Sequence, residues 1–176
     1  MATIKGDSRN EELTGSADPD IISGFGGMDT LLGLAGDDLI FGGDGFMNTN
    51  EANDDDTIRG GTGDDVLAGE GGDDRMFGDA DDDLLFGNAG NDTMDGGTGI
   101  DTVNYGESLT SIVLRINGTT TGEGTDTLAN IENAVGSQHG DLIFGDAGGN
   151  VIEGLAGNDD IRGGDGDDQL LGQVGN

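Results

Sequence analysis

Large aliphatic side chains recur at every ninth residue along most of this chain, and a carboxylate stands two positions before almost every one of them. From residue 6 to residue 104 the frame holds through eleven consecutive nonamers. The apolar position is filled by Leu13, Ile22, Leu31, Ile40, Thr49, Ile58, Leu67, Met76, Leu85, Met94 and Val103. Ten of these eleven residues are apolar, so the period describes a repeated structural unit.

Each nonamer predicts a turn of six residues followed by a strand of three. Glycines at positions one, two and four, as at Gly60, Gly61 and Gly63, allow a tight turn with positive φ. Side chains alternate along a strand, so position eight points inward while positions seven and nine point outward. Two nonamers then make one coil. Stacked coils make an all-β fold, a parallel β-roll, with two short-stranded sheets face to face.

Position six of the turn carries the acid, and its residue type predicts a metal. The occupants are Glu11, Asp20, Asp29, Asp38, Met47, Asp56, Asp65, Asp74, Asp83, Asp92 and Asp101. A Ca²⁺ ion takes about 6–8 oxygen ligands, including carboxylates and backbone carbonyls. One turn cannot supply that many, whereas two stacked turns can. We therefore expect calcium between successive turns, stabilising the β-roll.

The nonamer has a known counterpart in the pattern G-G-x-G-x-D-x-U-x, where U is a large aliphatic residue. A full match is Gly60-Gly61-Thr62-Gly63-Asp64-Asp65-Val66-Leu67-Ala68. Over 6–104 and 136–171 the sequence resembles the RTX (haemolysin-type calcium-binding repeat) family. The resemblance implies a bacterial secreted protein that leaves the cell unfolded by type I secretion and folds in extracellular calcium.

One nonamer, 46–54, fails the pattern, and two interpretations stay open. It could be a degenerate rung with Met47 and Thr49 in the key positions. We favour a nine-residue loop, because removing 46–54 joins residues 42–45 to 55–59 in a full match.

The period breaks at 105–135, which we expect to be a non-repeat β connector between block one (1–104) and block two (136–176). Ile112, Leu114 and Ile116 alternate as in a strand, and Asn117-Gly118 is a strong hairpin signal. Repeat-like spacing returns at 121–129, followed by a connector at 130–135. We expect a hairpin or wider rungs to cover the middle of the β-roll.

Block two restores the frame for four nonamers and stops within a further repeat. Its position six holds Asp141, Asn150, Asp159 and Asp168, and its position eight holds Ile143, Ile152, Ile161 and Leu170.

The predicted metal ligands are the position-six residues of the regular turns. They are Asp20, Asp29, Asp38, Asp56, Asp65, Asp74, Asp83, Asp92, Asp101, Asp126, Asp141, Asn150, Asp159 and Asp168. Position-four residues are predicted to add backbone carbonyls or an extra carboxylate: Asp18, Asp81, Gly27, Gly36, Gly63, Gly72, Gly90, Gly99, Gly157 and Gly166. For Asp18 and Asp81 the alternative is tolerated variation at an exposed turn. The expected cofactor is Ca²⁺, roughly 8–12 ions.

Composition strengthens the dependence on metal. The chain has 37 Asp plus Glu against 6 Lys plus Arg, a net charge of −31. Because these acids repel one another around a thin core, we expect the metal-free chain to be largely unfolded. The charge also argues against nucleic acid and anionic membranes as partners, and no apolar run is long enough to span a bilayer. The expected partners are calcium and a neighbouring domain of a longer chain, a polysaccharide or a cell surface.

Catalysis has little support in the sequence, and we predict no catalytic residue. His139 is the single histidine and lies in a turn, and there is no cysteine. A zinc-protease motif needs two histidines. The functions that remain are a calcium-dependent folding module, a structural or adhesive surface protein, and the repeat portion of a secreted protease, lipase or epimerase.

Overall fold

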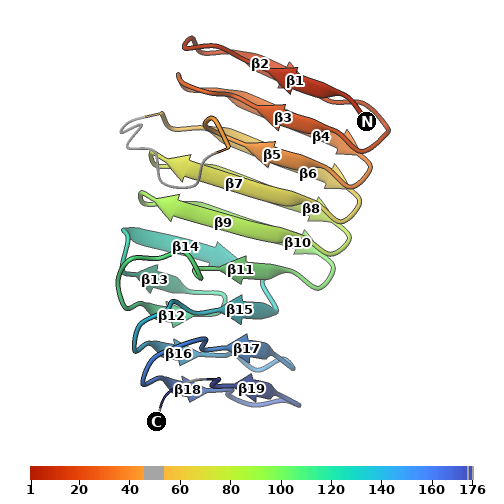
Figure 1. Ribbon diagram of the computed structural model, residues 1–176. Coiled ribbons are helices and arrows are strands. Elements are labelled where there is room, and N and C mark those ends of the chain that lie inside the picture. Colours follow the sequence, from red (N-terminus) through yellow and green to blue (C-terminus); the bar gives the residue numbers. More distant parts are fainter. Residues whose placement is uncertain (46–53, 174, 176) are drawn as a thin grey trace.

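The structure is a computed structural model that describes residues 1–45, 54–173 and 175. Within them the chain forms nineteen strands and no helix (Figure 1). No helix that could cross a membrane is found among these residues. The strands form two sheets that face each other, so the predicted β-roll is confirmed.

Apart from β13, odd and even strands separate into the two sheets, because each regular coil contributes one strand to each. The nine-stranded sheet runs β1 (Thr3–Lys5), β3 (Ile21–Ser23), β5 (Leu39–Phe41), β7 (Val66–Gly71), β9 (Leu84–Ala89), β11 (Thr102–Asn104), β15 (Asn133–Val135), β17 (Val151–Glu153) and β19 (Gln169–Leu171). The ten-stranded sheet runs β2 (Glu12–Thr14), β4 (Thr30–Ala35), β6 (Thr57–Thr62), β8 (Arg75–Ala80), β10 (Thr93–Thr98), β14 (Thr125–Ala129), β13 (Thr119–Thr121), β12 (Val113–Arg115), β16 (Leu142–Phe144) and β18 (Asp160–Arg162).

The core is a double column of position-eight side chains. Leu67 of β7 pairs in register with Leu85 of β9, and Ile58 of β6 with Met76 of β8. All four are fully buried. The columns thin at the ends, where Leu13 is half-buried and Leu170 is 45% exposed. The period of nine therefore fills the core with one aliphatic residue per strand.

The register changes once in block one. Leu13 pairs with Leu31 across 18 residues, the length of one coil, but Leu31 pairs with Ile58 across 27. A degenerate rung at 46–54 would place Ile58 opposite Ile40, whereas the loop interpretation requires this offset of 27. The loop prediction itself falls on residues 46–53, which lie outside the described residues.

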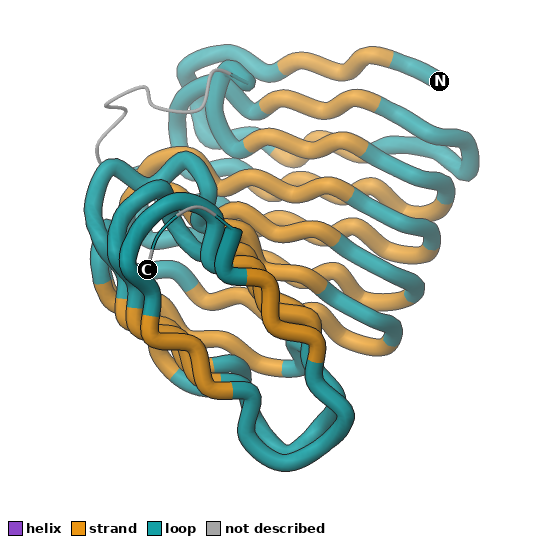
Figure 2. The backbone as a smooth tube through the Cα atoms, turned by 60° about the horizontal axis from the view of Figure 1, so that its bottom comes forward, coloured by secondary structure: helices purple, strands orange, loops and turns teal. Residues whose placement is uncertain are grey.

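The hairpin predicted at Asn117-Gly118 is confirmed. Val113 of β12 pairs antiparallel with Thr121 of β13, and the Gly118 amide donates to the Arg115 carbonyl at 3.1 Å. We expected the hairpin to cover the β-roll, but β12 and β13 are members of the ten-stranded sheet. Between β10 and β16 this sheet holds three strands where a regular coil supplies one. The nine-stranded sheet has no additional strand between β11 and β15. The strands of the two blocks run in different directions (Figure 2).

Candidate metal centre

The position-six acids form two ladders, one along each edge of block one. One ladder joins Glu11, Asp29, Asp56, Asp74, Asp92 and Asp126, and the other joins Asp20, Asp38, Asp65, Asp83 and Asp101. In each step the backbone N–H of one acid donates to Oδ1 of the acid in the next coil, at 2.7 to 3.1 Å. Ladder aspartates are at most 2% exposed. The first carboxylate oxygen is thus used to join the coils.

The second oxygen, Oδ2, is left without a hydrogen-bond donor in most slots. Among the described residues this holds for Asp29, Asp38, Asp65, Asp74, Asp83, Asp92, Asp101 and Asp159, whose Oδ2 atoms are buried. Leaving a buried carboxylate oxygen without a hydrogen-bond partner destabilises the folded state by about 1–3 kcal/mol or more. Eight repeated cases at equivalent positions indicate that another group completes them.

These oxygens face backbone carbonyls of the next coil. A Cβ added to Gly78 would clash with both Oδ2 of Asp83 and the carbonyl oxygen of Gly96. The same arrangement recurs at Gly33, with Asp38 and Gly60. Two oxygens from neighbouring turns therefore converge on one point at most position-one glycines, although Gly87, Gly154 and Gly163 have only the carboxylate oxygen nearby. The position-one glycine has no positive φ, so it is needed for space, whereas Gly61 and Gly63 at positions two and four have φ near 120°.

Position-four carbonyls point the other way, toward the following coil. The carbonyl oxygens of Gly36, Gly72, Gly90 and Gly157 face the glycines at 63, 90, 124 and 175, and that of Asp81 faces the glycine at 99. In other cases the position-four glycine is itself approached by a carbonyl oxygen of the preceding coil. This holds for Gly27, Gly63, Gly99 and Gly166. The side chain of Asp81 accepts from the Gly63 amide at 3.1 Å, and Asp18 is exposed. Their role as ligands stays a prediction.

This oxygen-only donor set fits Ca²⁺, a hard cation that accepts carboxylates and carbonyls together. No cluster of three or more His, Cys, Asp or Glu side chains able to hold a metal occurs among the described residues. Such a cluster is not required here, because most ligands of each site would be backbone carbonyls.

Burial weakens the acidity of four ladder carboxylates in particular. It raises the pKa of Asp56 and Asp92 to about 8, and that of Asp74 and Asp83 to about 7, against the lowering effect of the amide each accepts. Neighbouring carboxylates raise these pKa values further. A bound cation would reverse this effect by favouring the charged form.

In three predicted slots the protein supplies the missing donor. Oδ2 of Asp20 accepts from the amide and hydroxyl of Ser16, and the amide of Ala2 and these serine bonds lower the pKa of Asp20. At Asp141 the Ser137 amide donates to Oδ2 and the Ser137 hydroxyl donates to Oδ1. Oδ2 of Asp126 accepts from the Tyr105 hydroxyl at 2.7 Å, and both groups are buried.

Block two continues both edges with fewer bonds. The amide of Asp141 donates to Asp159, and that of Asn150 donates to Asp168, each at 3.0 Å. The Asn150 side chain is satisfied by protein, accepting from the Asp146 amide and donating to the Glu132 carbonyl. Calcium binding by Asp20, Asp126, Asp141 and Asn150 stays a prediction that these contacts do not favour.

Sequence reasoning missed two groups at these edges. One is the carbonyl of the position-one residue, which no side-chain pattern reveals. The other is Glu132, which lies in the stretch interpreted as a connector and accepts from the Asp101 amide at 2.9 Å. In the sequence, the one sign of this role is that Glu132 directly precedes Asn133-Ala134-Val135, as a position-six acid precedes its strand. In the structure the middle residue, Ala134, is buried like a position-eight residue.

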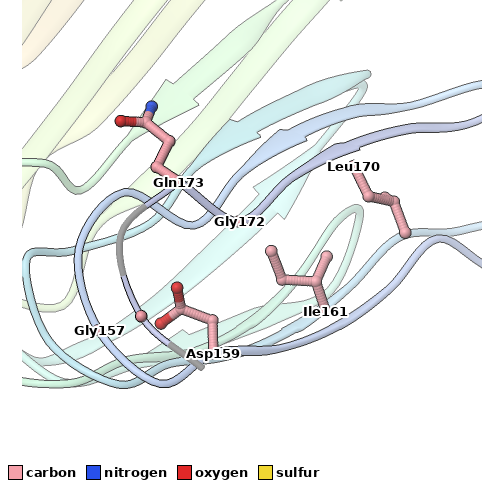
Figure 3. A pocket seen from close by; sticks show the side chains of 7 residues that line it. Gly157, Asp159, Ile161, Leu170, Gly172 and Gln173 are labelled. Carbon is pink, nitrogen blue, oxygen red and sulfur yellow. The ribbon is translucent and has the colours of Figure 1, made fainter.

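A hollow of about 460 Å³ opens at the C-terminal end of the β-roll (Figure 3). Its lining includes the position-eight residues Ile161 and Leu170 and a single carboxylate, Asp159. His139 is exposed on a turn and is not part of this lining. The hollow is the open end of the core, and its lining shows no arrangement of paired catalytic groups.

Comparison with known protein families identifies the repeated nonamer. A family model described as RTX calcium-binding nonapeptide repeat (4 copies) matches residues 5–27, 23–45, 52–85, 72–103 and 135–176. A search of curated proteins finds no match. The matches to the family model cover well over half of the chain and span both blocks. The chain therefore belongs to the RTX calcium-binding repeat family, and it is a calcium-binding repeat module.

Proposed function

We propose that this module folds when it binds extracellular Ca²⁺ and thereby serves the type I secretion, folding and stability of a secreted protein. The observation that carries the proposal is the row of eight buried Oδ2 atoms without a protein donor, all but those of Asp92 and Asp159 facing a carbonyl oxygen of the neighbouring turn. About 8–12 Ca²⁺ ions would complete these sites and the less regular ones beside them.

The physical argument is one of linkage. Charged carboxylates that are buried without a partner disfavour the folded state, and the net charge of −31 adds repulsion throughout the chain. Because an ion between two turns removes both penalties, calcium binding and folding become one process. The chain would stay unfolded in the calcium-poor cytoplasm, as export requires, and would fold outside the cell.

The same proposal assigns no catalytic role to the chain. The single histidine, His139, is exposed, and its amide donates to the hydroxyl of Ser137 within its own turn. The partners we propose besides calcium are a neighbouring domain of a longer chain, a polysaccharide or a cell surface.

A calcium titration of the metal-stripped chain, followed by far-UV circular dichroism with Mg²⁺ as the control, tests the proposal. A cooperative change from coil to β structure that Mg²⁺ does not produce is the expected result. A chain that is already rich in β structure without calcium would show that packing and backbone pairing suffice. The structural or adhesive function would then be preferred.

A further inference from the structure

Glu132 occupies the place of a position-six acid although its turn lacks the repeat motif. Only residues 130–132 lie between Ala129 and Asn133, whereas six residues, 96–101, lie between their strand partners Asp95 and Thr102. The amide of Asn133 donates to the Asp101 carbonyl at 2.9 Å, just as the amide of Thr102 donates to the Asp83 carbonyl at 2.9 Å. The backbone therefore sets Glu132 one coil beyond Asp101 in the same ladder.

The side chain of Glu132 also makes the ladder contact. Its Oε2 accepts from the Asp101 amide at 2.9 Å, matching the bond in which Oδ1 of Asp101 accepts from the Asp83 amide at 2.9 Å. Glu132 thus makes the ladder contact although its turn is three residues shorter.

The other oxygens of a ladder site are present at the same point. Asp101 is fully buried, and its Oδ2 has no hydrogen-bond donor. A Cβ added to Gly96 would fall on this Oδ2 and on the carbonyl oxygen of Asn130. At the preceding coil the equivalent pair is Oδ2 of Asp83 and the carbonyl oxygen of Gly96, so Asn130 supplies the carbonyl that position one supplies elsewhere.

The protein holds this short turn in place with side chains. Asn117 accepts from the Ile131 amide at 2.9 Å and donates to the Ile131 carbonyl at 3.1 Å. Asn130 has a φ of 50°, and its side chain donates to Asp95 at 2.7 Å. Ile131 itself is fully buried in the core. The direction of the Asn130 carbonyl is therefore set by the folded chain.

We propose that Asp101, Glu132 and the carbonyl oxygen of Asn130 form a divalent-cation site, occupied by Ca²⁺, at the junction of the two blocks. The inference rests on the proposed calcium-dependent folding, and it assigns Glu132 and the Asn130 carbonyl as the partners of Asp101 in a turn where the repeat pattern predicts no ligand. The carbonyl of Glu132 accepts from the Asn150 side chain at 2.8 Å, and the Asn150 amide donates to Asp168 at 3.0 Å. One edge ladder is thereby continued from block one into block two.

The test compares Glu132→Gln with Glu12→Gln, a matched loss of one negative charge on an exposed strand residue. Glutamine keeps an oxygen that can accept from the Asp101 amide, so the turn should persist. Native mass spectrometry at saturating calcium counts the bound ions, and circular dichroism verifies the fold. Tyr105, the single tyrosine of a chain without tryptophan, reports locally by fluorescence, since its amide donates to the Val135 carbonyl of β15 at 3.0 Å.

We expect Glu132→Gln to hold one ion fewer than the wild type and to shift the tyrosine transition several-fold toward higher calcium, while Glu12→Gln does neither. Glu132→Asp, which keeps the carboxylate, should retain the ion. If the Gln variant fails to fold while the Asp variant folds fully loaded, the carboxylate is again required. Equal ion counts and midpoints in all variants would overturn this site alone, whereas a wild type that binds no calcium would overturn the proposed function.

Discussion

Each ladder aspartate divides its two oxygens between two tasks. Oδ1 of Asp65 accepts from the Asp38 amide at 2.7 Å, while its Oδ2 is buried without a donor. The adjacent Asp64 is exposed and only accepts a long bond from Asp82, at 3.1 Å. Two neighbouring acids of the same type therefore have different roles, decided by their position in the nonamer.

Asp65→Ala should weaken calcium-dependent folding far more than Asp64→Ala. The change removes a ligand and leaves the Asp38 amide unpaired, which costs about 1–3 kcal/mol. The calcium midpoint measured by circular dichroism should rise about tenfold. Asp64→Ala should leave it nearly unchanged, and equal shifts for the two variants would contradict the frame assigned to the repeats.

The position-one glycine provides a second test at this scale. In Gly78→Ala the new methyl group would occupy the point where Oδ2 of Asp83 and the Gly96 carbonyl meet, so it should exclude one ion. Gly172→Ala is the control, because nothing lies within 4 Å of its Cβ position. Ion counting by native mass spectrometry should show one ion fewer in the first variant and no loss in the second. Retention of every ion in Gly78→Ala would place the ions elsewhere.

Among the elements, the hairpin insert supplies a hydrogen bond to a carboxylate oxygen that lacks a donor in most other slots. Its flanking strand β14 brings Asp126 into the ladder beneath Asp92, and Tyr105 from the start of the insert donates to the oxygen that is free in other slots. The desolvation that accompanies this burial, together with the charge and hydrogen bond of Asp126, raises the pKa of Tyr105. The hydroxyl thus stays protonated and remains a donor.

Tyr105→Phe should therefore destabilise the junction. The buried Oδ2 of Asp126 loses its donor, at a cost of about 1–3 kcal/mol. We expect the calcium midpoint of folding to rise about tenfold, measured by circular dichroism because the variant has no tyrosine. Leu109→Ala, at a residue that is 67% exposed in the same insert, is the control. An unchanged midpoint would show that the ladder does not need this bond.

At the scale of the whole molecule, protons and calcium compete for the same carboxylates. The folded-state pKa values of Asp56, Asp74, Asp83 and Asp92 lie at about 7 to 8, raised first of all by burial. An unfolded aspartate has a pKa of about 4. Between these values the metal-free folded state binds protons that the unfolded state releases. Its stability is therefore greatest below about pH 4 and is lost progressively as the pH rises from about 4 to about 8.

The metal-stripped chain should accordingly contain more β structure at pH 5 than at pH 8, as measured by circular dichroism. Calcium should abolish this difference, and its binding near pH 7 should release protons into a weakly buffered solution. A metal-free chain that is equally unfolded at both pH values, with no proton release on adding calcium, would contradict the assigned burial of these acids.

The sequence alone determines the repeating part of the architecture. A strand of three residues alternates its side chains, so the pattern places Leu67 in the core, where it is fully buried, and Asp65 at the end of the turn. The hairpin at Asn117-Gly118 is equally local, because turn chemistry depends on adjacent residues. These features depend on residues at most nine positions apart, so they can be predicted from the pattern of the sequence.

Tertiary structure decides which carboxylates lack a partner and where the insert lies. Tyr105 reaches Asp126 across 21 residues, and Asp101 reaches Glu132 across 31, so neither contact leaves a trace in the period. The insert enters one sheet because β14 pairs with β10 and β12 with β16, which are choices made between distant strands. The physical reason is that an oxygen's partner is set by the stacking of coils, and stacking joins residues that the nonamer pattern treats as independent.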